Sequence, residues 1–248
     1  MGGVRLILEV KNLSKSFGGL KAIKQLNLTV NKGEITGLIG PNGSGKTTFF
    51  NVISGLLKPD MGTIIFDGKE VTGLPPHEIC RSGIARTFQL TKPFARMPPL
   101  ENVMVGRIYG CNPAKSMKQA REEAGEILRI TGLDRKHVPI AAALGLVDRK
   151  RLEIARALAT KPKLLLLDEM MAGLNSREIE DVIKLIQDIK DSGVTIILVE
   201  HVLKAVLKLS DRIIVLSAGE KIAEGFPHEV ITNKKVVEAY LGEEQHYA

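Results

Sequence analysis

Tryptophan is absent from this sequence of 248 residues, and all aromatic residues together account for only 4% of it. Proteins that hold single-stranded nucleic acids commonly stack the bases on aromatic side chains, so such a surface is not expected. Cysteine is also scarce, because Cys80 and Cys111 are the only two and they form no close pair in the sequence. This usage fits a reducing compartment and excludes a disulfide-rich scaffold.

Long hydrophobic runs are missing as well. Leu164–Leu167 and Val194–Val199 have the length of strands, whereas a membrane-spanning helix needs about 18 or more apolar residues. The first residues, Met1–Phe17, lack the apolar segment and cleavage site of a secretory leader. We therefore expect a cytoplasmic chain that does not itself span a membrane.

Charge of one sign is not concentrated anywhere, although the net charge is +7. Basic and acidic residues are mixed in segments such as Lys118–Arg129. Hydrophobic residues make up 44% and charged residues 25%, which is typical of a folded globular protein. The pattern indicates a solvated surface, and we expect no nucleic-acid partner.

The first part of the chain predicts strands. Leu6–Val10 and Leu26–Val30 are strand-like, and Glu34–Gly40 is an apolar run that ends at a glycine-rich turn. Thr63–Val71 has Asp-Gly in its centre, which predicts a hairpin. Gly83–Phe88 is a further candidate strand.

The later part alternates between the two kinds of element, with the strands and helices Leu164–Leu167, Ser176–Asp191, Val194–Val199, Val202–Leu209 and Arg212–Ser217. Such alternation predicts an α/β fold with a mostly parallel sheet. Between the halves lies a proline-punctuated, helical stretch with an apolar face that includes Ala120, Ala124, Ile127 and Leu128. We expect one domain, in which residues 1–91 and 162–248 form the core and about 92–161 an inserted helical subdomain.

The sequence GPNGSGKT, Gly40–Thr47, satisfies the pattern of a phosphate-binding P-loop between a strand and a helix. Glycines let the backbone N–H groups wrap around phosphates, and the start of the helix adds a favourable field. Lys46 would contact the β- and γ-phosphates, and the Thr47 hydroxyl would bind Mg²⁺. An unrelated glycine turn is the alternative. The expected nucleotide-binding residues of this loop are Gly40, Pro41, Asn42, Gly43, Ser44, Gly45, Lys46, Thr47 and Thr48.

Two acids follow the buried run Leu164–Leu167, namely Asp168 and Glu169. The carboxyl edge of such a sheet is where open α/β folds bind ligands. There Asp168 can reach the Mg²⁺ shell, and Glu169 can orient or deprotonate the attacking water. Alone, an acidic pair after a strand is more often a helix cap and turn. Together with the P-loop, the pair favours a nucleotide hydrolase.

The chain resembles the ATP-binding subunits of ATP-binding-cassette (ABC) transporters, and the similar motifs cover essentially its whole length. The resemblance implies a P-loop NTPase core with an N-terminal antiparallel β part and an inserted helical subdomain. It implies that ATP and Mg²⁺ are bound, with Phe17 in "SKSFGG" stacking on the adenine. It also makes Gln89 a metal ligand beside Thr47 and Asp168.

The same resemblance assigns catalytic roles to Glu169, to Gln89 after a strand, and to His201 in "VEH". The segment Ala172–Asn175 matches the loop that contacts a partner subunit. Each residue also has a structural reading. Phe17 alone would be assigned to the core, Gln89 to a turn, and His201 to a hydrogen-bonded structural role.

Four phrases look like the subgroup that imports branched-chain amino acids, namely "FGGLKAI", "GIARTFQ", "RLEIARAL" and "EAYLGEE". This resemblance implies a Mg-dependent ATPase on the cytoplasmic face of the inner membrane. Its partners would be transmembrane permease subunits and a second ATPase subunit. The solute, the direction of transport and the choice between homodimer and heterodimer stay open.

One motif departs from the family. The signature segment before "RLEIARAL" usually reads Leu-Ser-Gly-Gly-Gln and closes over the ATP of the opposite subunit. In this chain the segment is Leu144, Gly145, Leu146, Val147 and Asp148. Gly145 replaces the serine and so removes the hydroxyl donor. Leu146 and Val147 place side chains where the backbone should contact phosphate. Asp148 brings a negative charge near the anionic ATP. We expect an asymmetric heterodimer; the alternative is that the start of the helix suffices and the change is tolerated.

Two other functions remain open on sequence grounds. One is an ABC ATPase that acts on nucleic acid or ribosomes, although the fused second cassettes, coiled-coil arms or basic tails usual in such proteins are not evident. The other is a regulatory subunit that binds ATP with little turnover. Segment Lys92–Val103 would contact the membrane subunit, or be a proline-rich connector.

Overall fold

The first two strands extend beyond their predicted apolar segments into polar residues. In the computed structural model, which describes the backbone of residues 5–89, 92–134 and 138–244, β1 spans Leu6–Phe17 and β2 spans Leu20–Asn31. The alternating pattern of β1 breaks after Val10, where the register against β2 shifts and Asn12 has a positive φ of 49°. This irregularity returns Leu13 to the core, so both strands are longer than predicted.

The chain forms two compact units, of which the first contains Met1–Ile79 and Thr195–Ala248. Its antiparallel sheet has the strand order β2-β1-β4-β5. The hairpin predicted around Asp67 and Gly68 is confirmed, with β4 at Met61–Phe66 and β5 at Lys69–Glu70.

The other strands of this unit have the order β10-β9-β3-β8, in which β3 runs parallel to both β8 and β9 and β10 runs antiparallel to β9. The bounds are β3 Ile35–Ile39, β8 Thr195–Val199, β9 Arg212–Ser217 and β10 Glu220–Gly225. Every residue of β3 and β8 is buried, as their apolar sequences predict. The antiparallel strand β10 was missed, because its residues are mainly polar and partly exposed.

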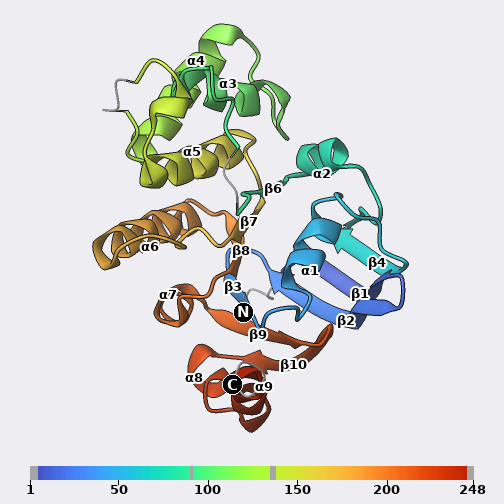
Figure 1. Ribbon diagram of the computed structural model, residues 1–248. Helices are drawn as coiled ribbons and strands as arrows, with labels where there is room; N and C mark the ends of the chain where they lie inside the picture. The colour runs from blue at the N-terminus through green and yellow to red at the C-terminus, as the bar shows by residue number, and fades with distance from the viewer. Residues whose placement is uncertain (1–4, 90–91, 135–137, 245–248) are drawn as a thin grey trace. The chain divides into compact units, whose positions relative to one another are not determined.

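The described residues of the first unit also form the helices α1 Lys46–Ile53, α7 Leu203–Leu209, α8 Pro227–Val230 and α9 Lys234–Glu244. Helices α8 and α9 contact β10 near the end of the chain (Figure 1). Ile39 and Val206 share a small apolar cluster with Val230 and Val236. The C-terminal helices therefore share an apolar cluster with the strand that leads into the P-loop.

The second unit contains Cys80–Val194, and α2 (Pro76–Ser82) leads into it. Its parallel strands are β6 Ile84–Arg86 and β7 Leu164–Asp168. Helices α3, α4 and α5 form a bundle (Figure 1). The helical segments are α3 Pro99–Tyr109, α4 Met117–Ile130, the 3₁₀ turn η1 Ala141–Ala143, α5 Leu146–Ala159 and α6 Ser176–Asp191.

The bundle is built on the predicted apolar face of α4. Ala120, Ala124 and Leu128 are buried against α3 and α5, whereas Ile127 is only partly buried. Helix α6 begins where predicted because Asn175 accepts from two backbone N–H groups and Glu178 returns the bond, which is a capping box. No helix of the described residues is both long and apolar enough to cross a membrane. The predicted fold class is confirmed.

Candidate functional site

The P-loop connects β3 to α1 and is shaped by close approaches that only glycine permits. A Cβ atom on Gly40, whose φ is 150°, would lie 2.0 Å from the carbonyl oxygen of Leu216. A Cβ atom on Gly45, whose φ is 106°, would lie 2.6 Å from the carbonyl oxygen of Ala22. The end of β9 and the beginning of β2 thus fix the loop backbone.

Lys46 lies inside this loop and is only 6% exposed. Its Nζ donates to the carbonyl oxygens of Gly40 and Pro41, at 2.6 and 2.8 Å, and to Ser44 Oγ at 3.3 Å. Helix α1 starts at Lys46 and has no acidic residue in its first turn, so its field favours an anion. Thr47 is exposed, which leaves its hydroxyl accessible.

Phe17 ends β1 and is 47% exposed, so it is not a core residue. Lys15 Nζ lies 5.8 Å from the centre of its ring. The beginning of β2, which follows Phe17 after a two-glycine turn, contacts the P-loop through Ala22. An exposed aromatic ring therefore lies on the hairpin that touches the phosphate loop.

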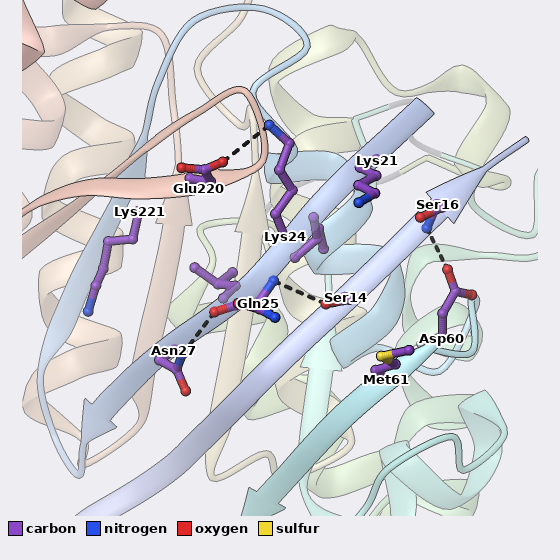
Figure 2. Close-up of a pocket in the computed structure, with 12 residues that line it drawn as sticks. Ser14, Ser16, Lys21, Lys24, Gln25, Asn27, Asp60, Met61, Glu220 and Lys221 are labelled. Atoms are coloured by element: carbon purple, nitrogen blue, oxygen red, sulfur yellow. Dashed lines mark hydrogen bonds and ion pairs between the residues drawn. The ribbon is translucent and has the colours of Figure 1, made fainter. Parts of the chain in front are cut away.

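A polar cavity of about 820 Å³ lies on the antiparallel part of the first unit (Figure 2). The figure shows charged and polar side chains paired with neighbours around it. Lys24 Nζ lies 3.2 Å from Glu220 Oε1, and Asp60 accepts from the backbone N–H of Ser16 at 2.6 Å. Lys15 Nζ lies 2.7 Å from Asp60 Oδ1. The hydrogen bonds from Lys15 and from the backbone of Ser16 lower the pKa of the Asp60 carboxyl group. P-loop residues do not line the cavity, and its charges are largely compensated.

His201 also belongs to the first unit. It is exposed and follows β8 after Glu200, which is only 5% exposed. The P-loop, Phe17 and His201 are thus placed at the ends of strands or turns of one unit.

In the second unit, β7 delivers Asp168 at its carboxyl end, where the residue is 3% exposed. Arg86 Nη2 on the neighbouring strand β6 lies 2.8 Å from Asp168 Oδ2. The contact engages one carboxylate oxygen, and Oδ1 receives no hydrogen bond from the described residues of this unit. Arg86 was missed by sequence analysis, because its partner lies 82 positions later and only strand pairing brings them together.

Glu169 and Gln89 lie in direct contact. Gln89 Nε2 donates to Glu169 Oε2 at 2.5 Å. The structure thus brings together the two residues that were predicted to act in catalysis. Glu169 has a left-handed φ of 49°, a conformation that costs a non-glycine residue about 1 kcal/mol or more. Residues held in such conformations are concentrated at functional sites.

Lys150 on α5 stabilises this backbone and was also missed by sequence analysis. It is 4% exposed, and its Nζ donates to the carbonyl oxygens of Ala172, Met170 and Glu169 at 2.6, 3.0 and 3.4 Å. A buried ammonium group that serves backbone carbonyls leaves no motif in a sequence, because any residue can supply a carbonyl.

The altered segment Leu144–Asp148 forms the start of α5. Gly145 is the N-cap, with no side-chain cap, and Leu146 begins the helix with 52% exposure. A Cβ atom on Gly173 would lie 3.4 Å from Leu146 Cδ2, so this leucine lies against the loop after β7. Asp148 is in the first helical turn and does not occupy the cap position.

Two further residues of α5 hold the segment that follows Gln89. Arg156 Nη1 donates to the carbonyl oxygen of Lys92 at 3.1 Å, and its guanidinium lies 4.9 Å from the ring of Phe94. Glu153 pairs with Arg156 at 3.0 Å, and burial raises the pKa of its carboxyl group despite this pair and a bond from the backbone of Phe88. Helix α5 is therefore bonded to both ends of this loop.

A strand, a glycine-rich loop with the phosphate-binding sequence and a helix that starts at a buried lysine together define a P-loop nucleotide-binding protein. Residues 23–172 match the family described as ABC transporter, and residues 220–246 match branched-chain amino acid ATP-binding cassette transporter. The chain belongs to the ABC transporter family and is one of its ATP-binding, ATP-hydrolysing subunits.

Three known proteins illustrate this relationship. The probable branched-chain amino acid transport ATP-binding protein LivG of Archaeoglobus fulgidus is 43% identical over 245 residues, which cover 95% of each chain. The ADP conformation of an ATP-binding cassette of an ABC transporter is 37% identical, with a TM-score of 0.86 over 96% of this chain and 99% of that chain. A dimeric cassette in a post-hydrolysis state with ADP and phosphate is 29% identical, with a TM-score of 0.80 over 89% and 99%.

Proposed function

We propose that this subunit hydrolyses Mg-ATP to power the import of branched-chain amino acids. The observation that carries the solute class is the match of residues 220–246, supported by the relative named for the same transport over nearly the whole chain. The chain would act on the cytoplasmic face of a membrane, bound to permease subunits that contain the solute pathway.

The P-loop and Phe17 would bind the nucleotide. Lys46 carries the positive charge for the β- and γ-phosphates, and the half-exposed ring of Phe17 offers a stacking surface for adenine. The loop backbone is fixed by β9 and β2, so its N–H groups need little reorganisation when phosphate binds.

The donor chemistry of the site fits Mg²⁺, which prefers a few protein oxygens together with phosphate oxygens and water. Thr47, Gln89 and Asp168 would hold the ion, which would neutralise charge on the phosphates. The described residues contain no cluster of three or more His, Cys, Asp or Glu side chains, so an all-protein cage is not the type of site in question.

Glu169 would orient the attacking water and accept its proton. Its carboxylate is already hydrogen-bonded by Gln89, and this bond fixes the direction in which Oε2 points. His201 would contact the γ-phosphate end as a polar group after β8.

The altered start of α5 leads us to propose a heterodimer with a related ATPase subunit. Leu146 is half-exposed at the first helical position and packs by Gly173, so an apolar side chain lies where phosphate-binding backbone would be needed. The chain would cleave ATP in a site that its partner completes, and would complete the partner's site poorly.

Segment Lys92–Val103 is the proposed contact with the permease. Its backbone is bonded to Arg156, and Asn102 is buried with its side chain bonded to Phe94. The segment is therefore attached to α5 at one end and to the start of α3 at the other, so movement of α5 would be passed to whatever binds it.

The test is leucine uptake into vesicles that contain permease subunits, this subunit and a related ATPase subunit. We expect leucine, isoleucine and valine to be taken up only with Mg-ATP, and a Glu169→Gln complex to bind ATP without uptake. Uptake of another solute class, with ATPase activity intact, would contradict the proposed solute. ATP binding with no turnover in any combination would favour a regulatory subunit.

A further inference from the structure

Arg86 pairs with the carboxylate that is proposed to hold Mg²⁺. Its Nη2 atom lies 2.8 Å from Asp168 Oδ2, and the exposed fractions of the two side chains are only 7% and 5%. The guanidinium also lies 5.2 Å from the ring centre of Phe88. A full positive charge is therefore buried beside the group that a metal cation would approach.

The backbone of the second unit fixes this ion pair in place. Strands β6 and β7 are paired in parallel, with Arg86 opposite Leu166. Thr87, which is fully buried, donates its N–H to the carbonyl oxygen of Leu166 at 2.9 Å, and its Oγ1 accepts from the N–H of Asp168 at 3.2 Å. The pair thus belongs to the sheet and differs from an exposed pair, which solvent screens and which contributes little.

The two acids after β7 have partners of different charge. Glu169 accepts from the neutral amide of Gln89, whereas Asp168 accepts from a guanidinium. A neutral donor orients a carboxylate without cancelling its charge, but an arginine does both. Arg86 therefore reduces the attraction between Asp168 and a bare cation, and burial makes this effect larger because the charges are screened less.

We propose that Arg86 makes the metal site selective for a divalent cation that arrives together with nucleotide. The guanidinium repels bare Mg²⁺, whereas Mg-ATP as a whole is an anion and is not repelled. Arg86 is thus a specificity-determining residue that acts through Asp168. The inference rests on the metal-binding role proposed above for Asp168.

A purely orienting role for Arg86 predicts the opposite sign. Hydrogen-bond partners of a metal-ligating carboxylate commonly support the ligand, and their loss then weakens metal binding by roughly 10- to 100-fold. Under the present proposal, loss of the charge strengthens the binding of bare cation. The direction of the change therefore separates the two roles.

The experiment is titration of the purified full chain with Mn²⁺, followed by the electron paramagnetic resonance signal of the free ion, without nucleotide and with ADP. Arg86→Gln keeps a hydrogen-bond donor but removes the charge. Without nucleotide, this variant should bind Mn²⁺ at least about tenfold more tightly than the wild type, because one repulsive charge is removed from a buried site. Binding of Mn-ADP, an anion, should not become tighter.

Two further variants identify the cause of the gain. Arg86→Lys keeps the positive charge and should bind bare Mn²⁺ as weakly as the wild type does. Arg151→Gln is the matched control, because Arg151 Nη2 lies 3.7 Å from Asp181 Oδ2 in the same unit. This control removes one guanidinium from another carboxylate and should leave Mn²⁺ binding unchanged.

Stability provides a second readout that does not depend on activity. A cation that binds the folded chain raises its free energy of unfolding. Mg²⁺ without nucleotide should therefore stabilise Arg86→Gln against urea more than it stabilises the wild type. The difference can be measured even where the variant is less stable in the absence of Mg²⁺.

Three results would overturn the proposal: bare Mn²⁺ bound no more tightly by Arg86→Gln than by the wild type, an equal gain in Arg86→Lys, or a gain that survives Asp168→Asn in the Arg86→Gln background. Failure of the proposed metal role of Asp168 is distinguishable, because Asp168→Asn alone would then leave Mg-ATP hydrolysis in the working dimer unchanged.

Discussion

Helices α1 and α5 both begin at a glycine without a side-chain cap, yet only α1 is built around an anion site. Gly45 is locked at a φ of 106° against Ala22, whereas Gly145 has an ordinary φ of −68° and open space around it. The first turn of α1 has no acid, and that of α5 has Asp148. A helix start attracts phosphate only where the surrounding backbone and side chains are arranged for it.

The strongest test of the comparison removes the lysine at the start of α1. Lys46→Ala should lower kcat/KM for ATP by roughly 100- to 1,000-fold, because a preorganised charge on the phosphates is lost. Steady-state hydrolysis and nucleotide titration measure the effect. Lys58→Ala, an exposed lysine after the same helix, is the control and should retain activity. Equal activity of both variants would contradict the assignment of the P-loop.

The two cap glycines can be compared directly by the same substitution. Gly45→Ala should cost about 2 kcal/mol or more of stability, because it combines left-handed backbone with a collision against Ala22. Gly145→Ala should cost only about 0.5–1 kcal/mol, the preference of the cap position for glycine over alanine, because its φ is ordinary and the space around it is open. Urea unfolding of the two variants measures the difference. Similar losses would show that α5 starts in a backbone as constrained as that of the P-loop.

The far end of α5 is held by a charge network that predicts a pH dependence. Hydrogen bonds from Lys161, Gln119 and Arg107 outweigh desolvation and lower the pKa of Glu123 to about 2. Arg107 is 1% exposed and donates to the carbonyl oxygen of Ala159, the last residue of α5.

Glu123→Gln should cost about 1–2 kcal/mol at pH 7, a value reduced because the carboxylate is partly solvated. Because the folded-state pKa is depressed, wild-type Glu123 stabilises the fold above its ordinary pKa of 4.5, and the stabilisation declines as the pH falls towards 2. The gap between wild type and variant in urea unfolding should therefore be smaller at pH 3 than at pH 7. A constant gap would exclude ionisation as its cause.

Glycines introduced at the start of α5 test whether its side chains keep the backbone away from phosphate. Leu146→Gly/Val147→Gly should raise ATP hydrolysis in the working dimer by about tenfold, equivalent to about 1.4 kcal/mol, because backbone regains access to phosphate. Leu203→Gly, another half-exposed leucine at a helix start, is the control and should not raise the rate. No gain in the double variant would show that the altered segment is tolerated.

The sequence predicts local features of this fold well and distant pairings poorly. The P-loop and α6 were predicted because glycine spacing and the capping residues act over a few positions. Strand β10 was missed because only pairing with β9 stabilises its polar residues. Arg86 and Lys150 were missed because their partners, Asp168 and the carbonyls after β7, are brought near only by the folded second unit.

The three carbonyl bonds of Lys150 give α5 a mechanical role that its altered start does not remove. One of the carbonyls belongs to Glu169, whose backbone has an uncommon left-handed φ. A rotation of α5 would therefore also displace the backbone at Glu169. Apolar residues can replace phosphate-binding residues at the start of α5 without breaking the bonds between Lys150 and the carbonyls after β7.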